Sequence, residues 1–133
     1  MSLEQLPSAV LITVSRDLDL SAIEALIRDT AADFLPSLIE VFEHETFERI
    51  ECIQTHLDEG SLDAIPEQAQ SLRGSAKTFG ATHLMYLADT VADAARRGEE
   101  GIAQATLAIF ATQRVAAIGC LNIINEALNA GSR

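Results

Sequence analysis

The sequence has little of several residue types, and each shortage excludes a class of protein. Aromatic residues make up 5% of the 133 residues and tryptophan is absent, while alanine occurs 21 times and leucine 16 times. This composition favours closely packed helices over a β-sandwich, which needs more aromatic and β-branched residues. Only 9 Lys and Arg stand against 20 Asp and Glu, a formal net charge of −11. A nucleic-acid partner is therefore excluded, because its phosphates would be repelled.

Cysteine and long apolar runs are also scarce. Two cysteines, Cys52 and Cys120, do not make the disulfide framework of a small secreted domain. We expect both thiols to be free, and a single disulfide between them stays open as the alternative. No apolar run reaches the roughly 18 residues that cross a bilayer, and the N-terminal residues lack the positive charge of a signal peptide. The sequence therefore predicts a cytoplasmic protein without membrane insertion.

Proline occurs only at positions 7, 36 and 66, so nothing in the last 67 residues prevents long helices. After residue 17, apolar residues recur at steps of three and four. The expected helices run from Asp19 or Ser21 to Asp29, from 31–33 to Gly60, from 61–66 to Gly80, from Thr82 as its N-cap to Gly98, and from Glu99 to Leu128. Residues 1–17 stand apart as an arm, in which Ala9–Val14 fits an extended segment, a short strand or a helical lead-in.

The short connections between the long helices predict the architecture. A turn of two or three residues cannot cross a bundle, so each helix must run antiparallel to the one before it. The sequence predicts an all-α protein: an antiparallel up-down four-helix bundle within residues 18–130, with an additional short helix at its start and the arm at 1–17. In the third long segment the apolar residues predicted to face the core are Ile65, Ala69, Leu72, Ala76 and Phe79.

The sequence lacks the patterns of the common metal and catalytic sites. Cys52 and His56 are four residues apart on one expected helix, but no second pair completes a set of zinc ligands. No Glu-x-x-His pair is present, as a di-iron bundle requires. The stretch 74–78 lacks both the glycine before its lysine and the preceding strand of a phosphate-binding loop, and no nucleophile is paired with a base. We expect no metal, no cofactor and no enzymatic activity.

The most informative segment is 69–81. Its apolar stripe leaves Gln70, Arg73, Gly74 and Lys77 on one outward strip. An outward glycine in the middle of a helix costs about 0.8–1 kcal/mol relative to alanine, so it needs a local reason. A partner that must approach the backbone closely is such a reason.

The charge pattern around this strip differs from that of the rest of the chain. Basic residues exceed acidic residues by two between Arg73 and Arg97, whereas residues 40–67 contain nine acidic residues and Arg49 alone as a basic one. A weakly positive patch in an acidic protein suits an anion or an acidic partner. The alternative is that these charges only solvate the helix surfaces.

The segment resembles the histidine-containing phosphotransfer (HPt) family, four-helix modules that pass phosphoryl groups between receiver domains. The family motif reads Ala-His-x-Leu-Lys-Gly-Ser, followed by Leu-Gly-Ala and by a leucine three residues further on. In the same register the chain has Ala69, Leu72, Arg73, Gly74, Ser75, Phe79, Gly80, Ala81 and Leu84. The resemblance extends from about Leu18 to Leu128.

One departure from the family pattern decides the expected function. Gln70 stands where the family has its phospho-accepting histidine. A neutral imidazole has a free electron pair on a ring nitrogen, whereas the pair on an amide nitrogen is held in resonance. The resemblance therefore implies a pseudo-phosphotransfer module of two-component signalling. Such a module binds a response-regulator receiver domain, a hybrid histidine kinase or both, without carrying phosphate. The docking residues that it implies are Gln70, Arg73, Gly74, Ser75 and Lys77.

Other interpretations stay open. One alternative is an active phosphotransfer protein whose acceptor histidine was replaced by Gln70 through engineering. Another is a phosphotransfer protein that uses His44, His56 or His83 as its acceptor. Against the latter, His83 is expected roughly 10 Å further along the bundle, and the other two lie in an acidic helix that repels a phosphoryl group. The chain can also be a structural bundle that oligomerises through Ala9–Val14. The sequence sets no oligomeric state.

Overall fold

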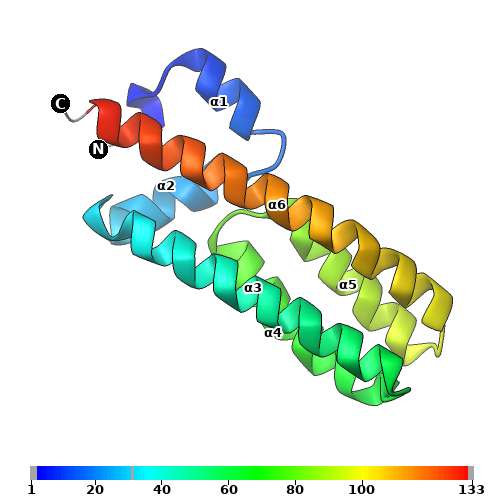
Figure 1. The fold of residues 1–133 in the computed structure, drawn as a ribbon. Coiled ribbons are helices and arrows are strands. Elements are labelled where there is room, and N and C mark those ends of the chain that lie inside the picture. The colour runs from blue at the N-terminus through cyan, green and yellow to red at the C-terminus, as the bar shows by residue number, and fades with distance from the viewer. Residues whose placement is uncertain (1–2, 31, 132–133) are drawn as a thin grey trace.

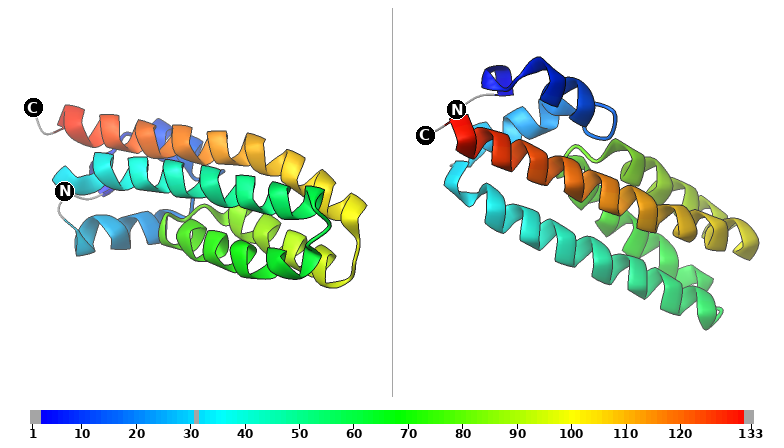
Figure 2. Two further views of the ribbon diagram at one scale, coloured as in Figure 1. Left: turned by 60° about the horizontal axis from the view of Figure 1, so that its bottom comes forward. Right: turned by 45° about the horizontal axis from the view of Figure 1, so that its top comes forward.

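The computed structural model describes residues 3–30 and 32–131, and every regular element among them is helical. This confirms the predicted all-α class. The long helices are α3 (Leu35–Asp58), α4 (Ile65–Thr78), α5 (Thr82–Arg96) and α6 (Glu100–Gly131). Figures 1 and 2 show them side by side, each beginning at the end of the bundle where the previous one stops. α3 and α5 each pack against both α4 and α6, which closes a four-helix ring.

Shorter elements precede the bundle helices. They are η1 (Leu3–Gln5), α1 (Ser8–Val14) and α2 (Leu20–Asp29), with 3-10 turns η2 (Ala32–Phe34) before α3 and η3 (Leu62–Ala64) before α4. Of the three possibilities for Ala9–Val14, the helical one is observed. α1 lies against α6 (Figure 1), and the side chains of Leu3, Leu6 and Val14 are buried. Residues 3–14 thus extend the core.

The core follows the apolar periodicity of the long helices. All five residues predicted to face inward from α4, between Ile65 and Phe79, are buried. The rings of Phe42 in α3 and Phe79 at the end of α4 have centroids 4.5 Å apart. This packing orients α4, so that Gln70, Gly74 and Lys77 are exposed. Burial of these apolar side chains, at roughly 25 cal/mol per Å², is the main force that fixes the outward strip.

The turn between α4 and α5 is held against α2. Gly80 has φ +66°, and its carbonyl accepts a hydrogen bond of 2.7 Å from the N–H of Asp19. Asp19 caps α2 as expected, because its side chain accepts from the N–H of Ser21. The expectation that Thr82 caps α5 was wrong. The turn places Ala81 at the N-cap position, and the Thr82 hydroxyl donates to the Gly80 carbonyl instead.

The predicted start of the second helix also needs correction. α3 begins at Leu35, later than the expected 31–33, because residues 32–34 form the tighter turn η2. Ala31 lies outside the described residues. Pro36 occupies the first turn of α3, where its missing N–H needs no partner.

α6 corrects the expectation that no segment is suited to a membrane. By length and composition it is the one helix in the described part of the chain that is long and apolar enough to cross a bilayer. A search for an unbroken apolar run misses α6, because glycine and uncharged polar residues such as threonine and asparagine interrupt its apolar stretches. Arg114 is the only charge between Glu100 and Glu126. In this fold α6 supplies core residues such as Phe110 and Leu121. Its apolar character therefore has a structural explanation.

Candidate functional site

Gln70 lies on the outer side of α4, opposite the buried stripe. Its side chain is exposed, as is that of Lys77, Gly74 exposes its backbone, and Arg73 is half-buried. A Cβ added at Gly74 would meet no atom within 4 Å outside its own helix backbone. The centre of the strip is therefore open backbone that a second molecule can approach.

The other predicted docking residues reach toward three different neighbouring helices. Arg73 extends toward α5, Ser75 donates a hydrogen bond of 2.8 Å to Glu45 Oε1 of α3, and Lys77 lines a hollow against α2. Only Gln70 and Gly74 form the open middle. The five residues thus share one helix but make different contacts, which helical spacing does not reveal.

A hollow of about 490 Å³ lies between α4 and α5, beside Gln70. It contains two ion pairs. Arg73 Nε is 3.0 Å from Asp89 Oδ1, and Arg96 Nη1 is 3.2 Å from Asp93 Oδ1. The lining residues are Pro66, Ala69, Gln70, Arg73, Ala88, Asp89, Ala92, Asp93 and Arg96.

These pairs change the expected electrostatics of the patch. The sequence count predicts an excess of two positive charges, but Arg73 and Arg96 each have an aspartate beside them. Lys77 and Arg97 form no ion pair within residues 3–30 and 32–131. The positive charge of the patch is therefore partly offset in the groove. Asp89, Asp93 and Arg96 are spaced four and three residues apart, which places them on one face of α5. This spacing is the sequence signal for the α5 side of the hollow.

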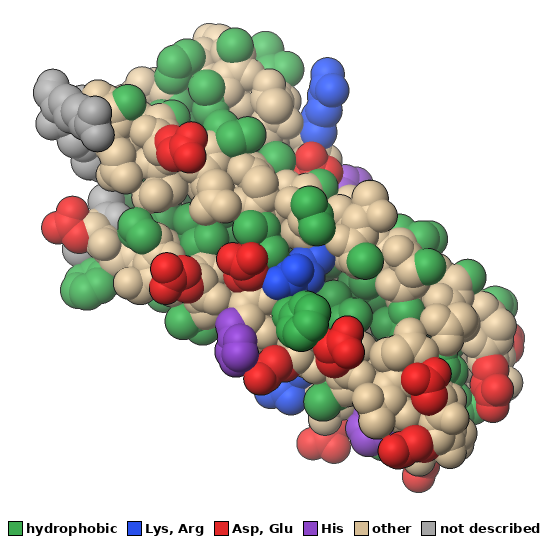
Figure 3. All heavy atoms as spheres, viewed as in Figure 1, with side chains coloured by type: hydrophobic (Ala, Val, Ile, Leu, Met, Phe, Trp, Pro, Cys, Tyr) green, Lys and Arg blue, Asp and Glu red, His purple; other side chains and the backbone are tan. Residues whose placement is uncertain are grey.

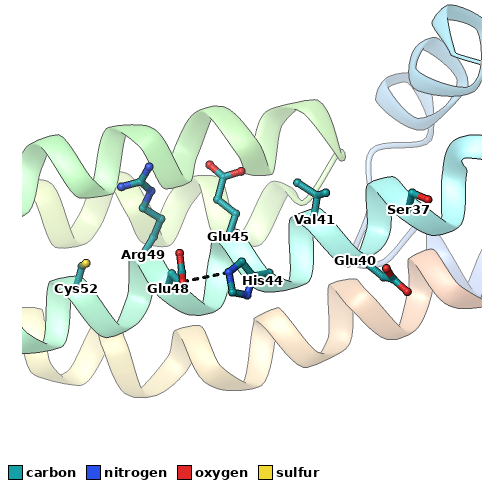
Figure 4. Close-up of a pocket in the computed structure, with 8 residues that line it drawn as sticks. All are labelled: Ser37, Glu40, Val41, His44, Glu45, Glu48, Arg49 and Cys52. Carbon is teal, nitrogen blue, oxygen red and sulfur yellow. Dashed lines mark ion pairs between the residues drawn. The ribbon is translucent and has the colours of Figure 1, made fainter.

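A second hollow, of about 470 Å³, lies along an exposed face of α3 and is lined by residues of this helix alone (Figure 4). Glu45 and Arg49 point toward α4, and Arg49 Nη1 donates a hydrogen bond of 2.9 Å to Gln68 Oε1. The residues that line it are Ser37, Glu40, Val41, His44, Glu45, Glu48, Arg49 and Cys52. We did not predict this groove from the sequence, although the residues recur at steps of three and four along one face.

The three histidines lie away from the strip. His83 Nε2 is 2.9 Å from the carbonyl oxygen of Arg16, so this nitrogen carries a proton and donates it. His44 Nε2 is 3.1 Å from Glu48 Oε1, and Nδ1 of His56 is buried without a hydrogen-bond partner among the described residues. None of them lines the hollow beside Gln70. Within residues 3–30 and 32–131, no group of three or more His, Cys, Asp or Glu side chains is arranged to hold a metal ion.

Both cysteines are free thiols in different surroundings. Cys52 is exposed on α3, and Cys120 is buried on α6. Burial is the largest cause that raises the pKa of Cys120 from 9.0 to about 11, and the negative charge of Asp17 and the hydrogen bond between the thiol and Asp17 are the other two. Cys120 Sγ is 3.6 Å from Asp17 Oδ2. A thiol in this state is a weak nucleophile.

Comparison with known proteins adds a family assignment to this geometry. A family model described as Hpt domain matches residues 37–130, more than half of the chain. The match covers all of α4 and α5 and leaves α1 and α2 outside. No curated protein and no solved structure matches the chain.

Proposed function

Because the chain belongs to the Hpt domain family, we propose that it is a pseudo-phosphotransfer module, which binds a response-regulator receiver domain through α4 and carries no phosphoryl group. Hpt domains are phosphotransfer carriers of phosphorelay signalling rather than enzymes, and their partners are response regulators and kinases. The observation that carries the proposal is an exposed glutamine at the open centre of α4, with Arg73 and Gly74 one turn further along the helix.

The chemistry of phosphoryl transfer explains why glutamine at this place matters. When a receiver passes its phosphoryl group to an Hpt domain, the P–O bond to an aspartate breaks and a P–N bond to an imidazole forms. The attacking nitrogen must supply an electron pair. The amide nitrogen of Gln70 has none to supply, because that pair is delocalised into the carbonyl. The phosphoryl group therefore stays on the receiver.

The residues around Gln70 remain suited to binding. The open backbone at Gly74 allows a receiver to approach closely, as no side chain fills that space. The amide of Gln70 offers two N–H donors and one acceptor to the acidic phosphorylation pocket of a receiver. Arg73 and Lys77 follow at one and two turns further along α4, where Lys77 supplies positive charge and Arg73 is shared with Asp89. A receiver held in this way is withheld from an Hpt domain that has its histidine.

The competing interpretation, a substitute acceptor, has little geometric support. The proton on His83 Nε2 is engaged by the Arg16 carbonyl, and His44 lies beside Glu48 on the acidic α3. A phosphoryl group at His44 would meet the repulsion of neighbouring carboxylates. Gln70 is therefore the position on which a test should concentrate.

The test uses a panel of purified receiver domains phosphorylated with radiolabelled acetyl phosphate. We expect at least one receiver to bind the wild-type chain, with no label transferred to it. The Gln70→His variant should gain acid-labile label from that receiver. Ser71→His is the matched control, because Ser71 is the exposed neighbour on the same helix and should gain none. Label on the wild-type chain, or no binding to any receiver, would refute the proposal.

A further inference from the structure

The outer side of α6 is apolar and almost free of charge. Of the most apolar 18 residues of this helix, 39% are buried, so the core accounts for only one side of it. Ile102 and Val115 are among the exposed residues, and Val115 is 66% exposed. Between Glu100 and Glu126 the sequence has no acidic residue and one basic residue, Arg114. A single arginine is thus the only charge over about 36 Å of helix.

Arg114 does not bring its charge to this outer side. Its Nε donates a hydrogen bond of 3.0 Å to Thr46 Oγ1, and its Nη2 donates one of 2.6 Å to the carbonyl oxygen of Glu43. The guanidinium also lies over the ring of Phe47, 5.4 Å from the ring centroid. All three contacts are with α3, so the charge lies at the border between α3 and α6. In Figure 3 the acidic side chains gather along α3, whereas the surface over α6 has few charged atoms.

α1 extends the uncharged region. It packs against α6, and its residues, Ser8–Val14, include no charged side chain. Ile12 of α1 is 63% exposed. Monomeric soluble proteins rarely leave a long apolar surface in water, so this surface indicates a binding partner.

The charge of the chain identifies that partner. An isologous interface pairs a surface with itself, so it needs a face that does not repel its own copy. With a net charge of −11, two copies repel each other through an acidic face such as that of α3, but not through α6. A membrane surface fits less well, because helices that lie on membranes have Lys and Arg on their polar side. We propose that the chain forms a homodimer through the outer side of α6.

The middle of α6 sets how the two copies pair. Ala105, Ala108, Thr112 and Val115 follow one another at steps of three and four and are all exposed, so they form one line on the helix. Thr112 is near the midpoint of the uncharged stretch. An antiparallel pair with its two-fold axis beside Thr112 overlaps the two stretches over their whole length and brings opposite ends of the helix dipoles together. Residue 112 of each copy then lies opposite residue 112 of the other.

This interface lies on the other side of the bundle from Gln70. α4 packs against α3 and α5, and α6 packs against the same two helices, so α4 and α6 are diagonal in the ring. The dimer therefore leaves the strip on α4 open, and each dimer presents two such strips. The inference goes beyond the proposed function and does not depend on it.

The first test follows the mass of the full chain by sedimentation velocity across the micromolar range. We expect a reversible equilibrium between monomer and dimer. A change from low to high NaCl concentration should strengthen dimerisation by about 3-fold or more, because salt screens the repulsion between two acidic copies. A chain that stays monomeric at high salt would overturn the inference. Binding of that monomer to phosphatidylcholine vesicles would assign the face to a lipid surface instead.

The second test exchanges charge at the two-fold axis. Thr112→Glu and Thr112→Lys should each weaken the dimer by about 10-fold or more, because each places two like charges opposite one another. A mixture of the two variants should recover dimerisation, which a misfolded variant would not do. Thr55→Glu and Thr55→Lys, at an exposed threonine of α3, are the matched controls and should change dimerisation by less than about 2-fold. An equal effect at Thr55, or no recovery in the mixture, would overturn the inference.

The third test locates the interface by cross-linking. In a Cys52→Ser chain, Thr112→Cys should give a disulfide-linked dimer on oxidation with copper phenanthroline, whereas Ser71→Cys on the exposed side of α4 should not. Cross-linking at position 71 but not at 112 would overturn the inference. Receiver binding is measured on the same chains. A monomer that binds a receiver would leave the proposed function standing, and a dimer that binds none would refute the proposed function alone.

Discussion

Asp89 of α5 holds Arg73 of α4 in an ion pair across the groove beside Gln70, with Asp89 Oδ1 3.0 Å from Arg73 Nε. The guanidinium that the family resemblance assigns to receiver docking is thus already partnered within the chain. A receiver that uses Arg73 must compete with Asp89 for it.

Removal of this competitor should strengthen binding. In Asp89→Asn the guanidinium is released, and we expect the affinity for the bound receiver to rise by about 2- to 10-fold, about 0.4–1.4 kcal/mol. The free energy of unfolding should change by less than about 1 kcal/mol, because both side chains are about half exposed and such pairs contribute little. Isothermal titration calorimetry and urea denaturation measure the two effects. Weaker binding by Asp89→Asn would contradict the role of Arg73.

Replacement of Gly74 by alanine should stabilise the fold and weaken receiver binding. Alanine at this mid-helix position has open space for its Cβ, so Gly74→Ala should raise the free energy of unfolding by about 0.5–1 kcal/mol. The same methyl group should weaken receiver binding, because it occupies the surface that a receiver approaches. Gly119→Ala in α6 is the matched control, since a Cβ there also meets nothing within 4 Å. It should stabilise the fold to a similar extent without changing affinity.

Gly80 should be far less tolerant than Gly98. Both have positive φ, +66° and +70°, so alanine at either costs about 1–2 kcal/mol from backbone strain. At Gly80 the new Cβ would also lie 2.6 Å from the Asp19 carbonyl oxygen, whereas at Gly98 it meets nothing within 4 Å. We expect Gly80→Ala to lose about 1–3 kcal/mol more than Gly98→Ala in urea denaturation. Equal losses would show that the contact between α2 and the α4–α5 turn is dispensable.

The two cysteines should differ in reactivity. At pH 8 the raised pKa of Cys120 lowers its thiolate fraction about 100-fold relative to a thiol of pKa 9.0, and burial slows it further. Ellman's reagent should therefore label one thiol in the native chain and two after unfolding. Cys52→Ser should abolish the native signal. Rapid native labelling in Cys52→Ser would contradict the buried environment of Cys120.

The same shift makes stability depend on pH at the alkaline end. The folded pKa of Cys120, about 11, lies above 9.0, so the folded state retains this proton over that interval while the unfolded state loses it. The contribution to stability is complete below pH 9 and is lost as the pH rises through 11. The difference in unfolding free energy between wild type and Cys120→Ala should decrease over this range. Asp17→Asn should lower the pKa of Cys120 and reduce the decrease.

Local patterns in the sequence were enough to place the four long helices, although α3 begins later than expected. The apolar steps of three and four predicted the buried stripe of α4 from Ile65 to Phe79, and the same periodicity left Gln70 on the outside. Glycines at positions 60, 80 and 98 end the helices with positive φ, as expected of residues without a Cβ. Both features depend on residues that are close together in the chain. They can therefore be predicted from the sequence alone.

Contacts between helices were decided only by the tertiary structure. The sequence counted Arg73 as a free positive charge, but the packing of α4 against α5 brings it to Asp89, sixteen residues away. Packing against α3 likewise joins Ser75 to Glu45, thirty residues away. Periodicity defines which side of a helix faces out, but the rotation and offset of neighbouring helices come from how their buried side chains interlock. Partners across a helix–helix border therefore follow from the packed core.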